Sequence, residues 1–296
     1  MSEKEKEIDE SSGIETTGHE WDGIKELNNP LPRWWLWTFY AAIVFSIGYI
    51  IWYPAIPLLN ASTMGISGTT NRGILSEQLK AVEEGRRATV EKLAASDLEV
   101  IRADAELSRF AAAGGSSLFK VYCTQCHGSG ASGSPGYPNL NDDDWLWGGD
   151  LESIYTSIKH GIRNDVDDDT RDSLMPSFGA DGLLEAAEIK AVVEYVLQIS
   201  DLEFDPALAQ TGRQLFADNC TSCHGENGKG DREFGGPNLA DSIVLYGSDR
   251  ASLRAQINKP KHGVMPPWGD KLTEAGVKQL AIYVHGLGGG EKAKAE

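Results

Sequence analysis

The four cysteines of the chain form two pairs with identical spacing, and a histidine directly follows each pair. The pairs stand in Cys123-Thr-Gln-Cys126-His127 and Cys220-Thr-Ser-Cys223-His224. Cys-x-x-Cys-His is the attachment signature of a c-type haem. Its two thiols add across the vinyl groups of the porphyrin, and the adjacent imidazole reaches the iron from one side. The motifs therefore predict two covalently bound haems c, with His127 and His224 as axial iron ligands.

Two other uses of paired cysteines compete with this interpretation. A tetrahedral zinc site could combine both pairs, but a long stretch separates Cys126 from Cys220, and the histidines would have no role. Thiol–disulfide exchange also uses Cys-x-x-Cys, yet no thioredoxin-like strand pattern surrounds either pair. Four cysteines are too few for a disulfide scaffold. Two matched motifs therefore favour haem attachment.

Each haem iron also needs a second axial ligand. A methionine sulfur is the usual choice in electron-transfer cytochromes because it raises the reduction potential. Met175 and Met265 each precede a proline at the same position of an internal repeat. Core packing is the competing role for a methionine, and His160 and His262 are candidates for bis-histidine ligation. The repeated Met-Pro pair favours Met175 and Met265.

Filled axial positions leave no vacant iron site for a substrate. Such a haem transfers electrons and does not catalyse the making or breaking of bonds in a substrate. We therefore expect an electron-transfer protein without catalytic residues of its own. His19 and His285 have no counterpart in the repeat and are expected at the surface or in packing.

The haem motifs lie in two copies of one longer pattern. The matching stretches are Gly115–Phe119 with Gly212–Phe216, Pro138–Leu140 with Pro237–Leu239, Leu146–Gly148 with Leu245–Gly247, and Leu174–Pro176 with Val264–Pro266. A repeat of this length predicts two complete domains, each of which buries its own core. Few alternating strand patterns occur, so the predicted fold is mainly α. It comprises tandem cytochrome c-like all-α domains at residues 114–202 and 206–290, with a tail at 291–296.

Residues 34–53 form a run of 20 positions without a charged side chain. As a helix the run would reach about 30 Å, the thickness of a bilayer's hydrocarbon core. Aromatic residues at both ends suit the headgroup level. A cleaved signal peptide would have a shorter apolar core and a basic leader, and a buried soluble helix is the other alternative. We expect one transmembrane helix, with Arg33 and the rest of residues 1–33 in the cytoplasm.

Residues 54–113 are expected to link the span to the haem domains. Apolar positions from Leu79 to Leu107, within a polar stretch, predict one or two amphipathic helices. We expect Gly114-Gly115 to end these helices, since glycine is common just after a helix.

The chain carries 27 Lys and Arg against 44 Asp and Glu, for a net charge of −17. Most of the excess negative charge falls within residues 115–200, where Asp142–Asp144 and Asp167–Asp169 are expected to be solvated surface. Nucleic-acid binding needs basic patches, so the composition argues against a nucleic-acid partner. Apolar residues at 41% and aromatic residues at 8% exclude general disorder.

The chain resembles a known family, the diheme c-type subunit III (CcoP or FixP) of the cbb-type cytochrome c oxidase. The resemblance covers about residues 17–290. Its most specific stretch runs from Gly18 to Tyr40, GHEWDGIKELNNPLPRWWLWTFY, and leads into the predicted span. The stretch Tyr283–Gly290, YVHGLGGG, also resembles the end of the family's sequences.

The resemblance implies a subunit anchored in the bacterial inner membrane, with both haems in the periplasm. It implies electron transfer from a cytochrome c donor to a monohaem cytochrome c subunit. Electrons would then reach the catalytic haem-copper subunit, which reduces oxygen in aerobic respiration and supports the proton-motive force. The implied axial pairs are His127 with Met175 and His224 with Met265. The carbonyls of Pro138 and Pro237 are the candidates for holding the two imidazoles.

Two alternative functions share these haem motifs. A diheme cytochrome subunit of a periplasmic dehydrogenase differs from the oxidase subunit only in the segment around the span. A diheme peroxidase would need one haem with an open or displaceable ligand, and the paired Met-Pro motifs argue against that.

Overall fold

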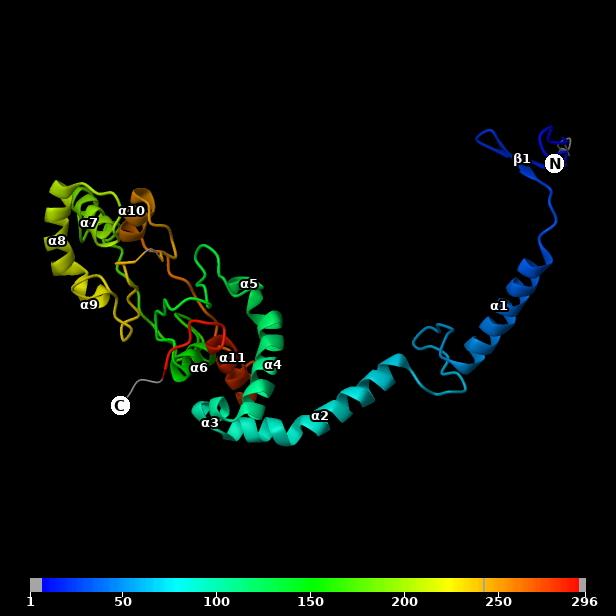
Figure 1. The fold of residues 1–296 in the computed structure, drawn as a ribbon, viewed down its shortest axis with the longest axis horizontal. Coiled ribbons are helices and arrows are strands. Elements are labelled where there is room, and N and C mark those ends of the chain that lie inside the picture. Colours follow the sequence, from blue (N-terminus) through cyan, green and yellow to red (C-terminus); the bar gives the residue numbers. More distant parts are fainter. Residues whose placement is uncertain (1–6, 242, 293–296) are drawn as a thin grey trace. The chain divides into compact units, whose positions relative to one another are not determined.

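The computed structural model describes residues 7–241 and 243–292 and divides into two compact units, residues 1–85 and 86–296 (Figure 1). In the first unit, β1 (Thr16–Trp21) and β2 (Ile24–Leu27) form an antiparallel hairpin. The hairpin turns at Asp22-Gly23, where both residues have a positive φ, the conformation that Asp-Gly turns favour. The hairpin adds a short β element to a chain that the sequence predicts to be mainly α.

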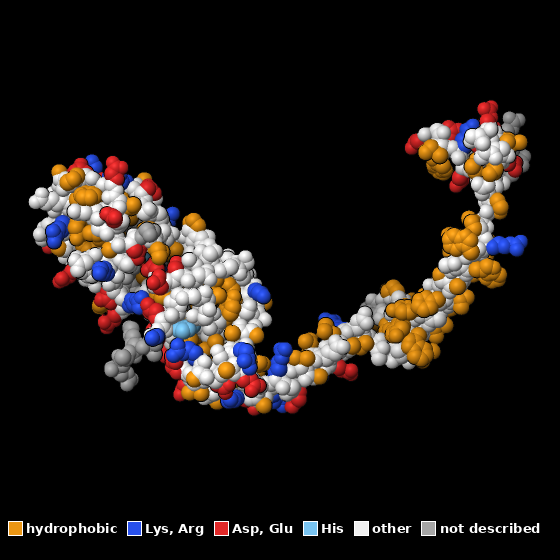
Figure 2. Space-filling view, in the orientation of Figure 1, with side chains coloured by type: hydrophobic (Ala, Val, Ile, Leu, Met, Phe, Trp, Pro, Cys, Tyr) orange, Lys and Arg blue, Asp and Glu red, His pale blue; other side chains and the backbone are white. Residues whose placement is uncertain are grey.

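Helix α1 (Arg33–Trp52) covers the segment predicted to cross a membrane. Figure 2 shows hydrophobic side chains around this helix, and none of its residues is buried. Among the described residues, it is the one helix long and apolar enough to span a bilayer. Pro54 follows shortly after its end and could not continue the helix without losing a hydrogen bond. The prediction of one N-terminal apolar span is confirmed.

Three helices follow: α2 (Asn71–Ala95), α3 (Leu98–Ala103) and α4 (Ala105–Tyr122). Asp104 begins α4 by accepting hydrogen bonds from the backbone N–H groups of Glu106 and Leu107. The expectation that Gly114-Gly115 end a linker helix is wrong, because both glycines lie inside α4. The helix continues through them to the first haem motif.

The rest of the chain is helical with long connecting segments, which confirms the mainly α fold class. The remaining helices are α5 (Thr124–His127), α6 (Leu151–His160), α7 (Ala186–Ile199), α8 (Pro206–Asn219), α9 (Thr221–His224), α10 (Arg250–Asn258) and α11 (Glu274–His285).

These helices build two hydrophobic cores. The first core joins Phe119 of α4, Ile154 of α6 and Leu280 of α11. Leu93 at the end of α2 and Ile101 of α3 also lie in this core. The linker therefore contributes its last part to the packing of the first core. In Figure 1, the red helix α11 lies beside α4 and α6, in agreement with their contacts.

The second core joins Val192 of α7, Phe216 of α8 and Leu253 of α10. Helix α7 ends the first repeat, yet it packs on α8 of the second, while α11 ends the second repeat and packs on α4 of the first. The expectation that each repeat buries its own core is therefore wrong. Residues 200–205 alone join α7 to α8, and helices joined by so short a connection usually pack as antiparallel neighbours.

Helices α7 and α11 each pack on a helix of the other repeat, and the chain segments that precede them cross. Ile162 and Met265 exchange two backbone hydrogen bonds of 2.9 Å each. Arg163 Nε donates to the carbonyl oxygen of Gly263 at 2.7 Å. Closer to the second core, the N–H of Ala180 donates to the carbonyl oxygen of Asn258 at 3.0 Å. These bonds hold the two connecting segments together where they cross.

Glycines at equivalent repeat positions let both helix pairs approach closely. A Cβ atom on Gly212 of α8 would lie 2.0 Å from the carbonyl oxygen of Ala191 in α7. A Cβ atom on Gly115 of α4 would lie 2.1 Å from the carbonyl oxygen of Gln279 in α11. No side chain fits at such distances, so the close helix crossing explains the glycine at this point of each repeat.

We predict that Gly212→Ala destabilises the second core by about 1–3 kcal/mol, because the added methyl group forces α7 and α8 apart. Thermal unfolding of the full chain, followed by circular dichroism, measures the change. Gly85→Ala in α2 is the matched control, since a Cβ there meets no atom within 4 Å and alanine favours the helix. Equal unfolding temperatures for Gly212→Ala and the unmodified chain would contradict the close crossing.

Candidate functional site

Each haem motif forms one helical turn directly after a longer helix. Cys123 ends α4, and its N–H donates to the carbonyl oxygen of Phe119 at 2.9 Å. The N–H of His127 donates to the carbonyl oxygen of Cys123 at 2.9 Å, which closes the turn. The second motif repeats this geometry at Cys220 and His224, again at 2.9 Å. Residues three or four apart lie on one helix face, so the turn presents both thiols and the imidazole to the same side.

The two imidazoles are held by proline carbonyls. His127 Nδ1 lies 3.1 Å from the carbonyl oxygen of Pro138, and His224 Nδ1 lies 3.0 Å from that of Pro237. A carbonyl oxygen only accepts, so Nδ1 of each ring donates and Nε2 keeps its lone pair. This second-sphere hydrogen bond is the kind that orients a metal-ligating histidine.

The imidazoles and the first thiol of each motif lie in apolar surroundings. Burial lowers the pKa of His127 and of His224 below the ordinary value, so both rings are neutral near pH 7. Burial also raises the pKa of the Cys123 and Cys220 thiols to about 11. A neutral imidazole is the form that can bind a metal.

The two methionines lie in opposite cores from those expected. Met265 packs against the first core, which contains Phe119 and contacts Cys123. Met175 packs against the second core, which contains Phe216 and Cys220. This packing is the reverse of the pairs that the resemblance implies, His127 with Met175 and His224 with Met265. The crossing of the connecting segments carries each methionine to the motif of the other repeat.

The alternative histidine ligands have other partners. His160 Nδ1 lies 3.0 Å from an oxygen of Asp167, and Asp169 stands 3.9 Å away. Burial, and next to it the charge of Arg163, lowers the pKa of His262. His285 Nε2 lies 2.7 Å from the carbonyl oxygen of Glu291, and His19 is exposed.

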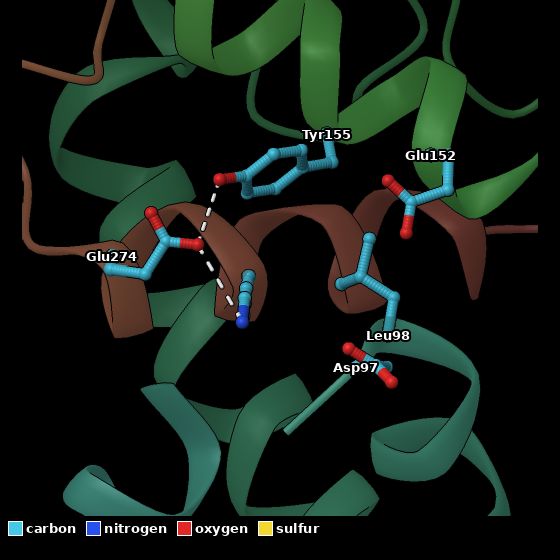
Figure 3. Close-up of a pocket in the computed structure, with 6 residues that line it drawn as sticks. Asp97, Leu98, Glu152, Tyr155 and Glu274 are labelled. Carbon is cyan, nitrogen blue, oxygen red and sulfur yellow. Dashed lines mark hydrogen bonds and ion pairs between the residues drawn. The ribbon is translucent and has the colours of Figure 1, made fainter. Parts of the chain in front are cut away.

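The structure also brings together groups that sequence reasoning missed. Tyr155 of α6 donates to Glu274 of α11 at 2.7 Å, and both line a cavity of about 190 Å³. Figure 3 shows these residues around the pocket. Lys278 Nζ lies 3.6 Å from the same carboxylate and donates to the carbonyl oxygens of Ala94 and Ser96 at 2.7 and 2.9 Å. The lysine thereby ties the end of α2 to α11. These residues come from distant parts of the sequence, and no motif marks them.

The two sets of donors fit a covalently bound haem c. In each set, two thiols and an oriented imidazole share one helical turn, and a methionine packs into the adjoining apolar core. Thioether attachment of a haem needs two such thiols. Axial ligation by histidine and methionine needs an imidazole nitrogen and a thioether sulfur that have no other partner and can approach the iron from opposite sides. The arrangement suits electron transfer.

The acidic segment that precedes α6 includes one perturbed carboxyl. The pKa of Asp144 is raised from 3.8 to about 6, first by burial and then by the charges of Asp241, Asp142 and Asp143. Arg232 opposes this shift. The expectation that Asp142–Asp144 form a fully solvated run is therefore wrong for Asp144.

Two family models match this sequence. The first is described as the N-terminal domain of cytochrome oxidase-cbb3, FixP, and matches residues 13–60. The second is described as Cytochrome C oxidase, cbb3-type, subunit III, and matches residues 110–196 and 207–284. Together they cover the apolar helix and both haem motifs.

Curated relatives are similar over nearly the whole chain. The Cbb3-type cytochrome c oxidase subunit CcoP of Cereibacter sphaeroides is 54% identical over 276 residues, which are 93% of this chain and 95% of that relative. The Cbb3-type cytochrome c oxidase subunit FixP of Sinorhizobium medicae is 50% identical over 291 residues, 98% of this chain and all of that relative.

We predict that Asp144→Asn stabilises the folded chain at pH 7–8 by about 1 kcal/mol, a value reduced for solvent screening at a half-exposed site. The folded chain holds the Asp144 proton between about pH 4 and 6, where the unfolded chain releases it. The free energy of unfolding therefore falls as pH rises through this window. Unfolding temperatures from pH 4 to 8 test this, with the exposed Asp168→Asn, outside the group of charges around Asp144, as control. A gain at pH 4 equal to that at pH 8 would contradict the raised pKa.

Proposed function

Because the chain belongs to the subunit III (CcoP/FixP) family of cbb3-type cytochrome c oxidases, we propose that its two motifs each bind one haem c with crossed methionine ligands. The protein is an electron-transfer subunit of that membrane-bound oxidase complex, and its cytochrome c-type domains carry haem c. It is anchored by α1 and works with other oxidase subunits. The subunit itself catalyses no reaction, while the complex is an oxidoreductase.

The proposed first haem is attached at Cys123 and Cys126, with His127 and Met265 as axial ligands. The proposed second haem is attached at Cys220 and Cys223, with His224 and Met175 as axial ligands. The observation that carries this assignment is that Met265 packs against the same core as Cys123, and Met175 against the core that includes Cys220. The boundaries 114–202 and 206–290 then describe the sequence repeats, and each haem site draws on both.

Haem c supplies a reversible one-electron iron couple when bound. The chain's own residues keep that couple free of side reactions. The Pro138 and Pro237 carbonyls hold the imidazoles in one orientation, and each methionine packs against an apolar core. With both axial positions filled, electrons can enter and leave while no ligand exchanges.

The proposed partners are a monohaem cytochrome c subunit, the catalytic haem-copper subunit and a cytochrome c donor. The proposed location is the bacterial inner membrane, with residues 1–33 in the cytoplasm and the haem domains in the periplasm. Arg33 at the start of α1 supports this orientation. Haem attachment to Cys-x-x-Cys-His on the outer side of the cytoplasmic membrane supports it as well.

We predict that variants that keep only one haem will show which methionine binds each iron. With Cys220→Ala and Cys223→Ala, only the first haem remains, and Met265→Leu should then abolish the weak near-infrared band of methionine-bound ferric haem. Met175→Leu in the same background should leave the band. The reciprocal chain with Cys123→Ala and Cys126→Ala should reverse both results. Loss of the band with Met175→Leu in the first background would instead establish pairing within each repeat.

We predict that protease added to spheroplasts digests both haem domains and spares a tag at Met1. Haem-stained fragments and tag immunoblots report the two sides separately. A cytoplasmic marker protein that stays intact is the control for membrane integrity. Protection of the haem domains, with digestion of the tag, would reverse the proposed orientation.

A further inference from the structure

Trp147 carries a buried hydrogen-bond donor without an acceptor. In residues 7–241 and 243–292, its Nε1 is the single buried side-chain nitrogen or oxygen that has no hydrogen-bond partner. An unsatisfied buried N–H costs about 1–3 kcal/mol, so native proteins rarely leave one. Trp145, two residues earlier, donates its Nε1 to the carbonyl oxygen of Gly289 at 2.6 Å. The missing acceptor of Trp147 is therefore specific to that indole.

A guanidinium group lies over the same indole. The Arg171 side chain stands 5.4 Å from the centre of the Trp147 ring. Its Nη1 donates to the Trp147 carbonyl oxygen at 3.2 Å and to Ser157 Oγ at 2.9 Å. In the described residues these bonds involve Nη1 alone, which leaves Nε and Nη2 for another acceptor. Burial lowers the pKa of Arg171, against a smaller opposing effect of Asp150.

An indole N–H beside a partly buried guanidinium is suited to an anionic acceptor. Arginine binds carboxylates in a planar, bidentate manner, and a carboxylate has oxygens enough for the indole as well. The haem carries two propionate carboxylates, so a carboxylate at this site can come from the cofactor itself. This step rests on the haem attachment proposed above.

The position of the pair points to the second haem. A Cβ atom on Gly235 would lie 2.3 Å from the Trp147 ring, so the indole packs against the loop between His224 and Pro237. Arg171 stands four residues before Met175, which packs against the core that includes Cys220. Trp147 therefore belongs to the first repeat by sequence and contacts the motif of the second.

The repeat places a similar aromatic contact at the first motif. Tyr246 occupies the position equivalent to Trp147, and its ring lies 3.5 Å from a Cβ built on Gly136, in the loop between His127 and Pro138. The Tyr246 hydroxyl oxygen would lie 3.4 Å from a Cβ built on Gly263, whose carbonyl oxygen accepts a hydrogen bond from Arg163 Nε. In both halves, an aromatic residue of one repeat thus packs against the loop that follows the motif of the other repeat.

We propose that Trp147 Nε1 and the Arg171 guanidinium bind a propionate carboxylate of the haem attached at Cys220 and Cys223. They are positioning residues that neutralise the propionate charge. Without them the uncompensated negative charge stabilises the ferric iron and lowers the reduction potential of that haem.

The test uses spectroelectrochemical titration of the purified oxidase complex. Trp147→Phe removes the N–H and Arg171→Gln removes the charge, and each should lower the reduction equilibrium constant of one haem about tenfold, about 59 mV for one electron. Arg171→Lys keeps the charge and should shift it less. Trp145→Phe is the matched control and should leave both potentials unchanged. The single-haem chains described above show which haem responds.

A shift in the chain that keeps only the second haem supports the proposal. Unchanged potentials in both Trp147→Phe and Arg171→Gln would overturn it, and so would a shift confined to the first haem or an equal shift in Trp145→Phe. Haem content of each variant is measured by alkaline pyridine spectra, and two haems per chain with an intact near-infrared band show that the fold is kept. Fewer than two haems in the unmodified chain would overturn the proposed function instead.

Discussion

The close crossing of α8 with α7, and of α4 with α11, is the constraint on which the rest of the structure depends. Gly212 and Gly115 permit this approach because any side chain there would collide with a backbone carbonyl of the partner helix. Once α7 packs on α8 and α11 on α4, the segments that precede α7 and α11 must cross. The crossing then decides which methionine reaches which haem motif.

The sequence predicted the secondary-structure elements and motifs far better than it predicted which helices pack against each other. The apolar span, the mainly α fold and the haem motifs follow from short-range patterns, which depend only on nearby residues. The same reasoning failed for Gly114-Gly115, since glycine ends helices and also permits close packing. It failed for the cores because two similar repeats present similar surfaces, so the pattern alone cannot distinguish α7 on α4 from α7 on α8. The short connection at residues 200–205 was the one signal that favoured the exchange.

The site itself was predictable in its types of donor and unpredictable in its arrangement. Cysteine, histidine and proline of each motif are close in sequence, so a loop of fixed length brings the Pro138 carbonyl to His127 Nδ1. The methionines lie far from the motifs, and their destination depends on the tertiary crossing. Trp147 was visible in the repeat, but the burial of its N–H without an acceptor needs three-dimensional packing to be recognised.

The exchange makes each candidate haem site depend on both repeats. Ile162 of the first repeat is hydrogen-bonded to Met265 of the second, and Arg163 holds Gly263 beside it. A methionine held in this way cannot move without disturbing the segment that carries the other one. Separate tandem domains could turn about their linker and change the distance between their centres. Two halves joined by exchanged helices resist such motion, because turning one half would pull its last helix out of the other's core. A fixed geometry between the two candidate haem sites suits an electron-transfer subunit.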